Sequence, residues 1–132
     1  MADHPIRVVV VDDDEDVLDL IATMFEIDDQ FALVGVASTA RSGLAEVRSR
    51  VPDVVVLDLE LPDESGLVLL DEIRSLALDV RTLVFSAFPD PFTLMDVLRR
   101  GADGYLDKAH TWSELLPTIR TLFHGTGTTL SA

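Results

Sequence analysis

The stretch RVVVVDDDEDV, residues 7–17, joins four consecutive valines to a run of five acidic residues. A continuous apolar run of this length is typical of a strand that is covered on both faces, as in a parallel sheet. Adjacent carboxylates repel one another, and a buried carboxylate without a partner is costly. The stretch therefore predicts a buried strand that ends at a site where another group compensates negative charge.

Five apolar segments of this kind alternate with helical patterns along the chain. They are rich in Val and Leu and occupy residues 6–11, 31–38, 53–57, 80–86 and 104–107. Strands that alternate with helices in this way form a parallel sheet with helices on both faces. The sequence therefore predicts one α/β domain with the strands in the order 2-1-3-4-5.

Two of the helical segments raise specific expectations. In residues 40–51 the apolar side chains recur every three or four positions up to Val51, which predicts one buried helical face. Thr111 and Glu114 form a capping-box pattern that predicts the start of the last helix. Pro117 would bend that helix unless the helix begins late, because proline lacks a backbone N–H.

Composition limits the kind of protein this is. The chain has 132 residues, 48% of them hydrophobic, and a formal net charge of −14, which suits one compact domain that repels polyanions such as nucleic acids. No apolar stretch is long enough to span a membrane, the N-terminus has no secretory pattern, and cysteine is absent. We therefore expect a cytoplasmic protein. Residues 125–132 are typical of the start of a linker, which places the domain at residues 1–124.

Polar groups follow four of the five predicted strands. Asp12 and Asp13 end the first strand, Asp58 the third, Ser86 the fourth and Lys108 the fifth. Ligands of such folds bind beyond the carboxyl ends of the strands, where the first and third strands are neighbours. The three acids should therefore converge, and they need a cation to neutralise them. Oxygen ligands without cysteine or a nearby histidine favour Mg²⁺.

The remaining acids of the run have a simpler explanation. Asp14, Glu15 and Asp16 fall at the cap and first turn of the following helix, where the helix dipole favours negative charge. A calcium-binding loop is excluded, because its sixth and twelfth positions would be Val17 and Thr23 instead of glycine and glutamate. The run therefore combines a predicted metal site with a helix start.

Ser86 and Lys108 indicate what the site binds. A hydroxyl and an ammonium beside a metal-bound carboxylate suit the three equatorial oxygens of a phosphoryl group. Asp58 would then be the nucleophile that forms an aspartyl phosphate. Taken singly, Ser86 is an ordinary strand-end hydroxyl, Lys108 a surface cation and Asp58 a turn acid. Only their combination favours the phosphoryl site.

Four motifs lie in register along the chain: VVVVDDDED, VVVLDLELPDESG, LVFSA and GYLDK. With them, residues 6–124 resemble the receiver domains of two-component response regulators. The tail GTGTTLSA resembles the linker that follows the receiver in NarL/LuxR-type regulators. The resemblance implies a flavodoxin-like (βα)5 fold and a signalling role instead of an enzymatic one.

The resemblance also assigns roles to the acids. It implies that a sensor histidine kinase phosphorylates Asp58 with Mg²⁺ present. Asp13 and Asp58 would bind the ion directly, together with the backbone carbonyl of Glu60. Asp12 would act through water.

Ser86 and Tyr105 would form the family's switch, which rearranges when Ser86 is drawn toward the phosphoryl group. Two departures from the family stand out. Many members have proline after the lysine, whereas Ala109 follows Lys108 here, so the bond between them could be cis or trans. The loop AFPDPF after Ser86 carries two prolines, which could restrict the fourth helix.

For the output, the resemblance implies transcription regulation through a DNA-binding domain that this chain lacks. The fourth helix, fifth strand and fifth helix would form a surface for a homodimer. Its mixed charges would come from Arg99 and Arg100 beside Asp103 and Asp107.

Two other functions stay open at this point. A stand-alone receiver would act by protein contact alone. A haloacid-dehalogenase-type phosphohydrolase also begins with an acidic motif after a strand. That class needs a further acidic pair after its lysine, and beyond Lys108 this chain offers only Glu114.

Overall fold

The computed structural model describes residues 4–87, 90–109, 112–125 and 129–131. The strands are β1 (Ile6–Val11), β2 (Phe31–Ala37), β3 (Val54–Leu57), β4 (Arg81–Ser86), β5 (Gly104–Asp107) and β6 (Thr129–Ser131). The α-helices are α1 (Glu15–Glu26), α2 (Ala40–Arg50), α3 (Gly66–Ser75), α4 (Pro91–Arg99) and α5 (Leu115–Phe123). A short 3-10 helix, η1 (Trp112–Glu114), precedes α5.

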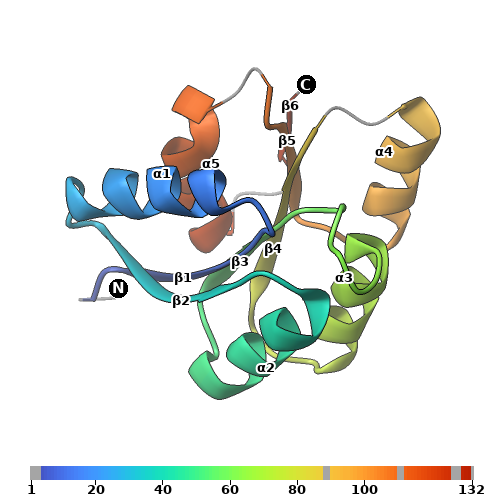
Figure 1. The fold of residues 1–132 in the computed structure, drawn as a ribbon. Coiled ribbons are helices and arrows are strands. Elements are labelled where there is room, and N and C mark those ends of the chain that lie inside the picture. The colour runs from blue at the N-terminus through green and yellow to red at the C-terminus, as the bar shows by residue number, and fades with distance from the viewer. Residues whose placement is uncertain (1–3, 88–89, 110–111, 126–128, 132) are drawn as a thin grey trace.

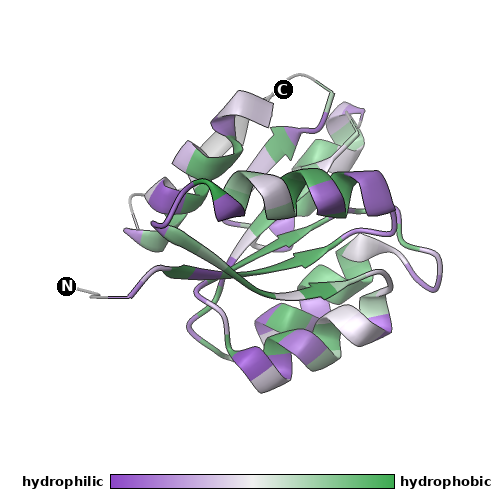
Figure 2. Ribbon diagram, turned by 60° about the vertical axis from the view of Figure 1, so that its left-hand side comes forward, coloured by the Kyte–Doolittle hydropathy of each residue, from purple (hydrophilic) through white to green (hydrophobic). Residues whose placement is uncertain are grey.

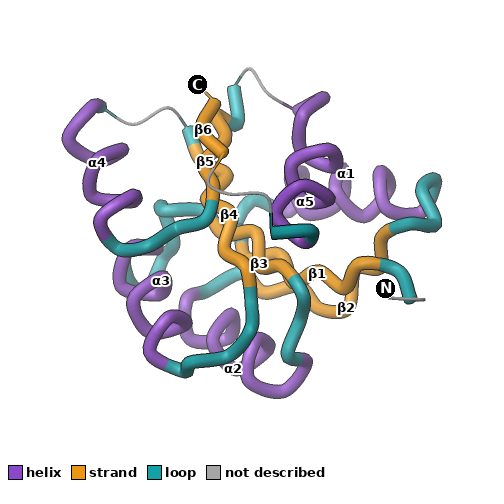
Figure 3. Tube along the Cα trace, turned by 180° about the vertical axis from the view of Figure 1, so that it is seen from behind, coloured by secondary structure: helices purple, strands orange, loops and turns teal. Residues whose placement is uncertain are grey.

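The strands form one parallel sheet in the order β2-β1-β3-β4-β5-β6. Helices α1 and α5 cover one face of the sheet, and α2, α3 and α4 cover the other (Figure 1, Figure 3). The predicted α/β fold, with the first five strands in the order 2-1-3-4-5, is confirmed. This order places the carboxyl ends of β1 and β3 side by side at the middle of the sheet.

The four valines of β1 explain why this strand is central. Val8 and Val10 belong to the apolar core under α1 and α5, whereas Val9 and Val11 belong to the core under α2 and α3. Burying each valine stabilises the fold by about 1.5–3 kcal/mol. In Figure 2 the strands are hydrophobic along their length, whereas the helices carry hydrophilic residues on their outer sides. The continuous apolar run therefore marks a strand with a core on each side.

The helix starts follow local chemistry. Asp14 is the N-cap of α1 and accepts the Asp16 N–H, with acids in the first turn, so the predicted helix start is confirmed. Helix α5 begins only at Leu115, which leaves Pro117 in its first turn, where the missing N–H removes no helical hydrogen bond. Thr111, the first residue of the predicted capping box, lies outside the described residues.

Among the described helices, none combines the length and apolar character needed to cross a bilayer.

Val51 departs from the expected buried face of α2. It is the C-cap of that helix with φ of 43°, in the left-handed region, and its side chain is 46% exposed. The two terminal guanidinium nitrogens of Arg7 donate to backbone carbonyls at the end of α2, to Arg50 at 2.8 Å and to Val51 at 2.9 Å. These contacts hold the helix end in a conformation that a β-branched residue rarely adopts.

The strand β6 was not predicted from the sequence. Its backbone pairs with β5 in parallel, from Gly104 opposite Thr129 to Leu106 opposite Ser131. Strand β6 lies in the tail of residues 125–132, whose small and polar residues form no apolar pattern that would predict a strand. The pairing rests on backbone groups, which every residue type provides.

Candidate functional site

The carboxyl ends of β1 and β3 bring the predicted acids together. Val11 pairs with Leu57 in the parallel register, and the Asp58 N–H donates to the Val11 carbonyl at 3.0 Å. One carboxylate oxygen from each of Asp12, Asp13 and Asp58 lies within 4.8 Å of the others. Asp12 and Asp58 are buried, whereas Asp13 is exposed. The three acids therefore meet at one point, as their strand positions predicted.

Lys108 compensates the charge of two of these acids. Its Nζ donates to Oδ2 of Asp12 at 2.6 Å and to Oδ2 of Asp58 at 2.8 Å. Burial acts to lower the pKa of Lys108, but its bonds to the two carboxylates outweigh burial and raise the pKa. Burial also raises the pKa of Asp12, against the opposing effect of Lys108. The ammonium thus supplies the compensation that the acidic run required.

The second oxygen of Asp58 is held by two further donors. The Ser86 hydroxyl donates to Oδ1 of Asp58 at 2.6 Å, and the Glu60 N–H donates to the same oxygen at 3.1 Å. Ser86 is buried at the end of β4, and its carbonyl accepts the Lys108 N–H at 2.8 Å. Both oxygens of Asp58 are therefore fixed in direction by neighbouring strand ends.

The loop that carries Asp58 turns back so tightly that it requires Gly66. A Cβ on residue 66 would lie 2.2 Å from the Asp58 carbonyl oxygen and 2.6 Å from the Leu59 Cα. The Gly66 N–H donates to the Leu59 carbonyl at 2.8 Å, and Ser65 caps α3 directly before it. Glycine is needed here because the backbone approaches closely, which a side chain would prevent.

Tyr105 lies inside the domain and its hydroxyl reaches the end of β4. The residue is fully buried, and its O–H donates to the Ser86 carbonyl at 3.3 Å. Burial, followed by the charges of Asp107 and Asp58, raises the pKa of Tyr105 to about 12. Beside this strand end lies a cavity of about 300 Å³, lined by residues of the β3–α3 loop, β4 and α4 that include Glu60, Ser86 and Thr93.

The two departures from the family pattern have different outcomes. Among the described residues no peptide bond is cis, so the Lys108–Ala109 bond is trans. The Ala109 N–H donates to the buried carboxylate of Asp107 at 2.9 Å, and Lys108 still reaches both of its acids. In the loop AFPDPF, residues 88–89 lie outside the described residues. Its Asp90 caps α4 and its Pro91 is the first helical residue.

The donor set fits a hard divalent cation. The three acids offer only oxygen atoms, which are the ligands that Mg²⁺ prefers, and these atoms can lie around a single ion. Both oxygens of Asp12 already accept hydrogen bonds, from the Asp14 N–H and from Lys108. Both oxygens of Asp58 also accept hydrogen bonds, from Ser86 and Lys108, so an ion bound here would share these oxygens with the protein's own donors. A bound Mg²⁺ would supply positive charge to oxygens that the protein brings to this edge.

One residue beside the site gave no signal in the sequence analysis. Asp63, in the loop after Asp58, accepts the N–H groups of Ala40 and Arg41 at 2.8 and 3.0 Å. These partners lie 23 and 22 residues away along the chain. No short-range pattern can show a contact of that separation.

The chain resembles known proteins over most of its length. The family described as the response regulator receiver domain matches residues 8–120. The chain is 31% identical to the nitrate/nitrite response regulator protein NarL of Escherichia coli, over 88% of this chain and 54% of that protein. It is 30% identical to the DNA-binding transcriptional activator DevR/DosR of Mycobacterium tuberculosis, over 91% of this chain and 55% of that protein.

Solved structures agree with the sequence comparisons. A two-component response regulator of the LuxR family from Aurantimonas sp. SI85-9A1 superposes with a TM-score of 0.88 and 28% identity, over 96% of this chain and 90% of that one. The sheet order and the converging acids define a flavodoxin-like α/β domain with an acidic site at the carboxyl ends of its strands. The chain belongs to the response regulator receiver domain family. It spans about half the length of the two curated relatives.

Proposed function

We propose that this receiver domain accepts a phosphoryl group on Asp58 from a sensor histidine kinase, with Mg²⁺ present. The observation that supports the proposal is the environment of the Asp58 carboxylate. One oxygen accepts from the Ser86 hydroxyl, the other accepts from Lys108, and two more acids converge beside it. These are the groups that phosphoryl transfer to a carboxylate requires, because it depends on positioning and on charge neutralisation.

Different residues of the chain would have separate roles in phosphoryl transfer. A carboxylate oxygen of Asp58 attacks the phosphorus of a phosphohistidine while the P–N bond breaks and the imidazole leaves. Lys108 and Ser86, which hold the carboxylate beforehand, lie within reach of the new phosphoryl oxygens. Mg²⁺, held by Asp13, Asp58 and the Glu60 carbonyl, with Asp12 acting through water, would neutralise the incoming negative charge.

Ser86 and Tyr105 would carry the change away from the site. A Ser86 hydroxyl drawn onto the phosphoryl group moves the end of β4, whose carbonyl accepts from the Tyr105 hydroxyl. The neighbouring cavity of about 300 Å³, which Thr93 of α4 also lines, gives that movement room. Phosphorylation would thus shift the population between two packed arrangements of β4, β5 and α4.

The test of the proposal is phosphorylation by a small donor. Incubated with acetyl phosphate and Mg²⁺, the protein should gain the mass of one phosphoryl group. With a chelator in place of Mg²⁺ it should gain none, because the converging acids repel an incoming dianion. Intact-mass spectrometry is the measurement. A protein that stays unlabelled at saturating Mg²⁺ would refute the phosphoacceptor function.

The relatives support a proposal for the output. DevR/DosR is a DNA-binding transcriptional activator, and the chain corresponds to about half of its length. The receiver would therefore control transcription through a DNA-binding domain in a longer protein. The acidic receiver itself, with a net charge of −14, would have no direct part in DNA binding.

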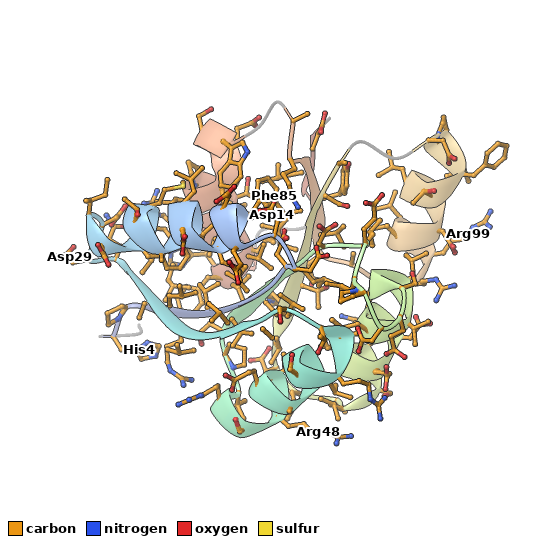
Figure 4. All side chains as sticks on the ribbon, in the orientation of Figure 1. His4, Asp14, Asp29, Arg48, Phe85 and Arg99 are labelled. Atoms are coloured by element: carbon orange, nitrogen blue, oxygen red, sulfur yellow. The ribbon has the colours of Figure 1, made fainter. Side chains whose placement is uncertain are left out.

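The four charges of the expected dimer surface lie in different environments. Asp107 is buried, Asp103 accepts the Thr82 N–H at 2.8 Å, and Arg100 donates to Asp71 of α3. Asp107 is therefore not part of the expected mixed-charge surface, whereas Asp103 and Arg100 are half-buried and bonded within the domain. Of the four charges, Arg99 alone projects outward from α4 (Figure 4).

The outer side of α4 is the better candidate for this surface. Phe92 is 84% exposed and Met95 is 50% exposed, and both lie on one helical face with Arg99. Exposed apolar side chains of this size are typical of a contact surface. Strand β6 pairs with the edge of β5, and α4 is the part of the α4–β5–α5 surface that carries these exposed apolar side chains. We expect two activated copies to meet there.

Sedimentation in the presence and absence of beryllofluoride, a phosphoryl mimic, would test this surface. The wild type should shift from monomer toward dimer when beryllofluoride and Mg²⁺ are added. A Phe92→Ser, Arg99→Glu variant should stay monomeric, because it loses the apolar contact and gains repulsion. Arg48→Glu, on the outer side of α2 (Figure 4), is the matched control and should dimerise. A wild type that stays monomeric in every condition would eliminate the dimer.

A further inference from the structure

The start of α2 is capped by a residue from another part of the chain. The first N–H groups of a helix have no partner within the helix and need acceptors. Thr39, the N-cap, accepts the Ser42 N–H at 3.0 Å in the usual local way. The N–H groups of Ala40 and Arg41 donate instead to the two carboxylate oxygens of Asp63, at 2.8 and 3.0 Å.

Asp63 belongs to the loop that carries the phosphorylation site. That loop runs from Asp58 at the end of β3 to Ser65 at the start of α3, and Glu60 lies two residues after Asp58. The two hydrogen bonds that Asp63 accepts from Ala40 and Arg41 tie the second half of the loop to α2. Bonds of a carboxylate to helical N–H groups are charge-assisted, and such bonds are about twice as strong as neutral ones. The bond with the Ala40 N–H, as the leading cause, holds the pKa of Asp63 below its usual value.

The other contacts near this loop do not connect it to α2 as Asp63 does. Glu64, the next residue, lies against Glu72 of α3, and the pKa of Glu64 is raised, first of all by its hydrogen bond with Glu72. Its Oε1 is buried and has no hydrogen-bond partner among the described residues. The pair formed by Arg41 and Glu72 at 3.6 Å joins α2 to α3 without involving the loop. Asp63 is therefore the side chain that ties the loop to α2.

We propose that Asp63 is a positioning residue for phosphorylation, which holds the β3–α3 loop so that Asp58 and the Glu60 carbonyl are preorganised for Mg²⁺. The proposal rests on the proposed function of Asp58. Asp63 touches neither the metal ligands nor the phosphoryl group; it acts through the backbone of the loop. Groups that hydrogen-bond directly to metal ligands typically affect metal affinity by about 10–100-fold, and a residue that acts through the backbone should lie at the lower end of that range.

Three variants separate positioning from simple loss of a helix cap. Asp63→Ala removes the cap and the tie between α2 and the loop. Thr39→Ala removes a cap from the same helix end, but the Thr39 side chain bonds only Ser42. This variant should therefore lose about as much stability as Asp63→Ala while the β3–α3 loop stays tied to α2. Asp63→Asn loses the charge but keeps one carbonyl oxygen that can accept an N–H. Urea denaturation of each variant measures the stability change.

The readouts are the Mg²⁺ dissociation constant, from titration calorimetry, and the rate of labelling by acetyl phosphate at saturating Mg²⁺. Asp63→Ala should raise the dissociation constant about tenfold. Thr39→Ala should leave it within about twofold of the wild type at a similar loss of stability. Asp63→Asn should fall between the wild type and Asp63→Ala. Saturating Mg²⁺ should restore most of the labelling rate of both Asp63 variants.

Three outcomes would overturn the inference. Equal Mg²⁺ affinities of Asp63→Ala and Thr39→Ala would show that Asp63 is only a helix cap. Equal effects of Asp63→Ala and Asp63→Asn would show that the lost charge alone is responsible. If Asp63→Ala does not fold, Asp63→Asn takes its place in the comparison. Equal Mg²⁺ dissociation constants of Asp63→Asn and Thr39→Ala would then overturn the inference. A wild type that binds Mg²⁺ but is never labelled would refute the function of Asp58 and leave the metal comparison readable.

Discussion

Asp58→Asn is expected to abolish labelling by acetyl phosphate while the domain stays folded. An amide is not a nucleophile at neutral pH, so no acyl phosphate can form at this position. The amide has the shape of the carboxylate. Its carbonyl oxygen can still accept a hydrogen bond from the Ser86 hydroxyl, which donates to Asp58 at 2.6 Å in the wild type. Intact-mass spectrometry after treatment with acetyl phosphate and Mg²⁺ measures the result. The variant should show no added phosphoryl group at times when the wild type is fully shifted.

The control for this experiment is Asp29→Asn. Asp29 is an exposed acid in the turn between α1 and β2 (Figure 4), and its change removes the same charge from the domain. This variant should be labelled at the wild-type rate. If Asp58→Asn were labelled at that rate as well, another group would accept the phosphoryl group, and the assignment of Asp58 would be wrong.

Lys108→Met is expected to destabilise the metal-free domain strongly. Lys108 is the only lysine in the chain, and its ammonium bonds two buried carboxylates, Asp12 and Asp58. Removing one partner of a buried pair leaves uncompensated charge, which costs about 3–5 kcal/mol. Since the Lys108 side chain is 18% exposed, we expect a loss of about 3 kcal/mol, at the lower end of this range. The free energy of unfolding, measured in urea, is the test.

Two conditions should recover part of the stability that Lys108→Met loses. Mg²⁺ returns positive charge to acids that lack the ammonium, so it should bind and stabilise the folded variant more than the wild type, and the deficit should shrink as Mg²⁺ is added. Acid should act in the same direction. The pKa of Asp12 is raised by burial, and loss of the opposing ammonium would raise it further. A carboxyl with a higher pKa in the folded state stabilises the fold at low pH and loses that effect as pH rises through the pKa.

Arg48→Met is the matched control for Lys108→Met. It removes one positive charge from the outer surface of α2 (Figure 4) and leaves the buried acids untouched. Its free energy of unfolding should stay within about 0.5 kcal/mol of the wild type. If Lys108→Met were as stable as Arg48→Met, the two buried acids would not depend on the ammonium, and the account of charge compensation would fail.

The sequence by itself determined the layout of the sheet and the place of the site. The valine run of β1 favoured a strand covered on both faces, and Val8 and Val9 indeed lie in different cores. Parallel strands end at the same edge, so Asp12 and Asp58 had to meet once the order was known. The cap at Asp14 followed from local chemistry, because it involves residues only two apart.

The tertiary structure alone decided which charged groups pair. Lys108 bonds Asp12 across 96 residues, Arg100 bonds Asp71 across 29, and Asp63 caps α2 across 23. A paired and a solvated side chain look identical in a sequence, so Arg100 was expected at the surface although it turns toward α3. The pairing depends on which helix lies beside which loop, and that is set by the packing of apolar faces and not by the polar residues themselves.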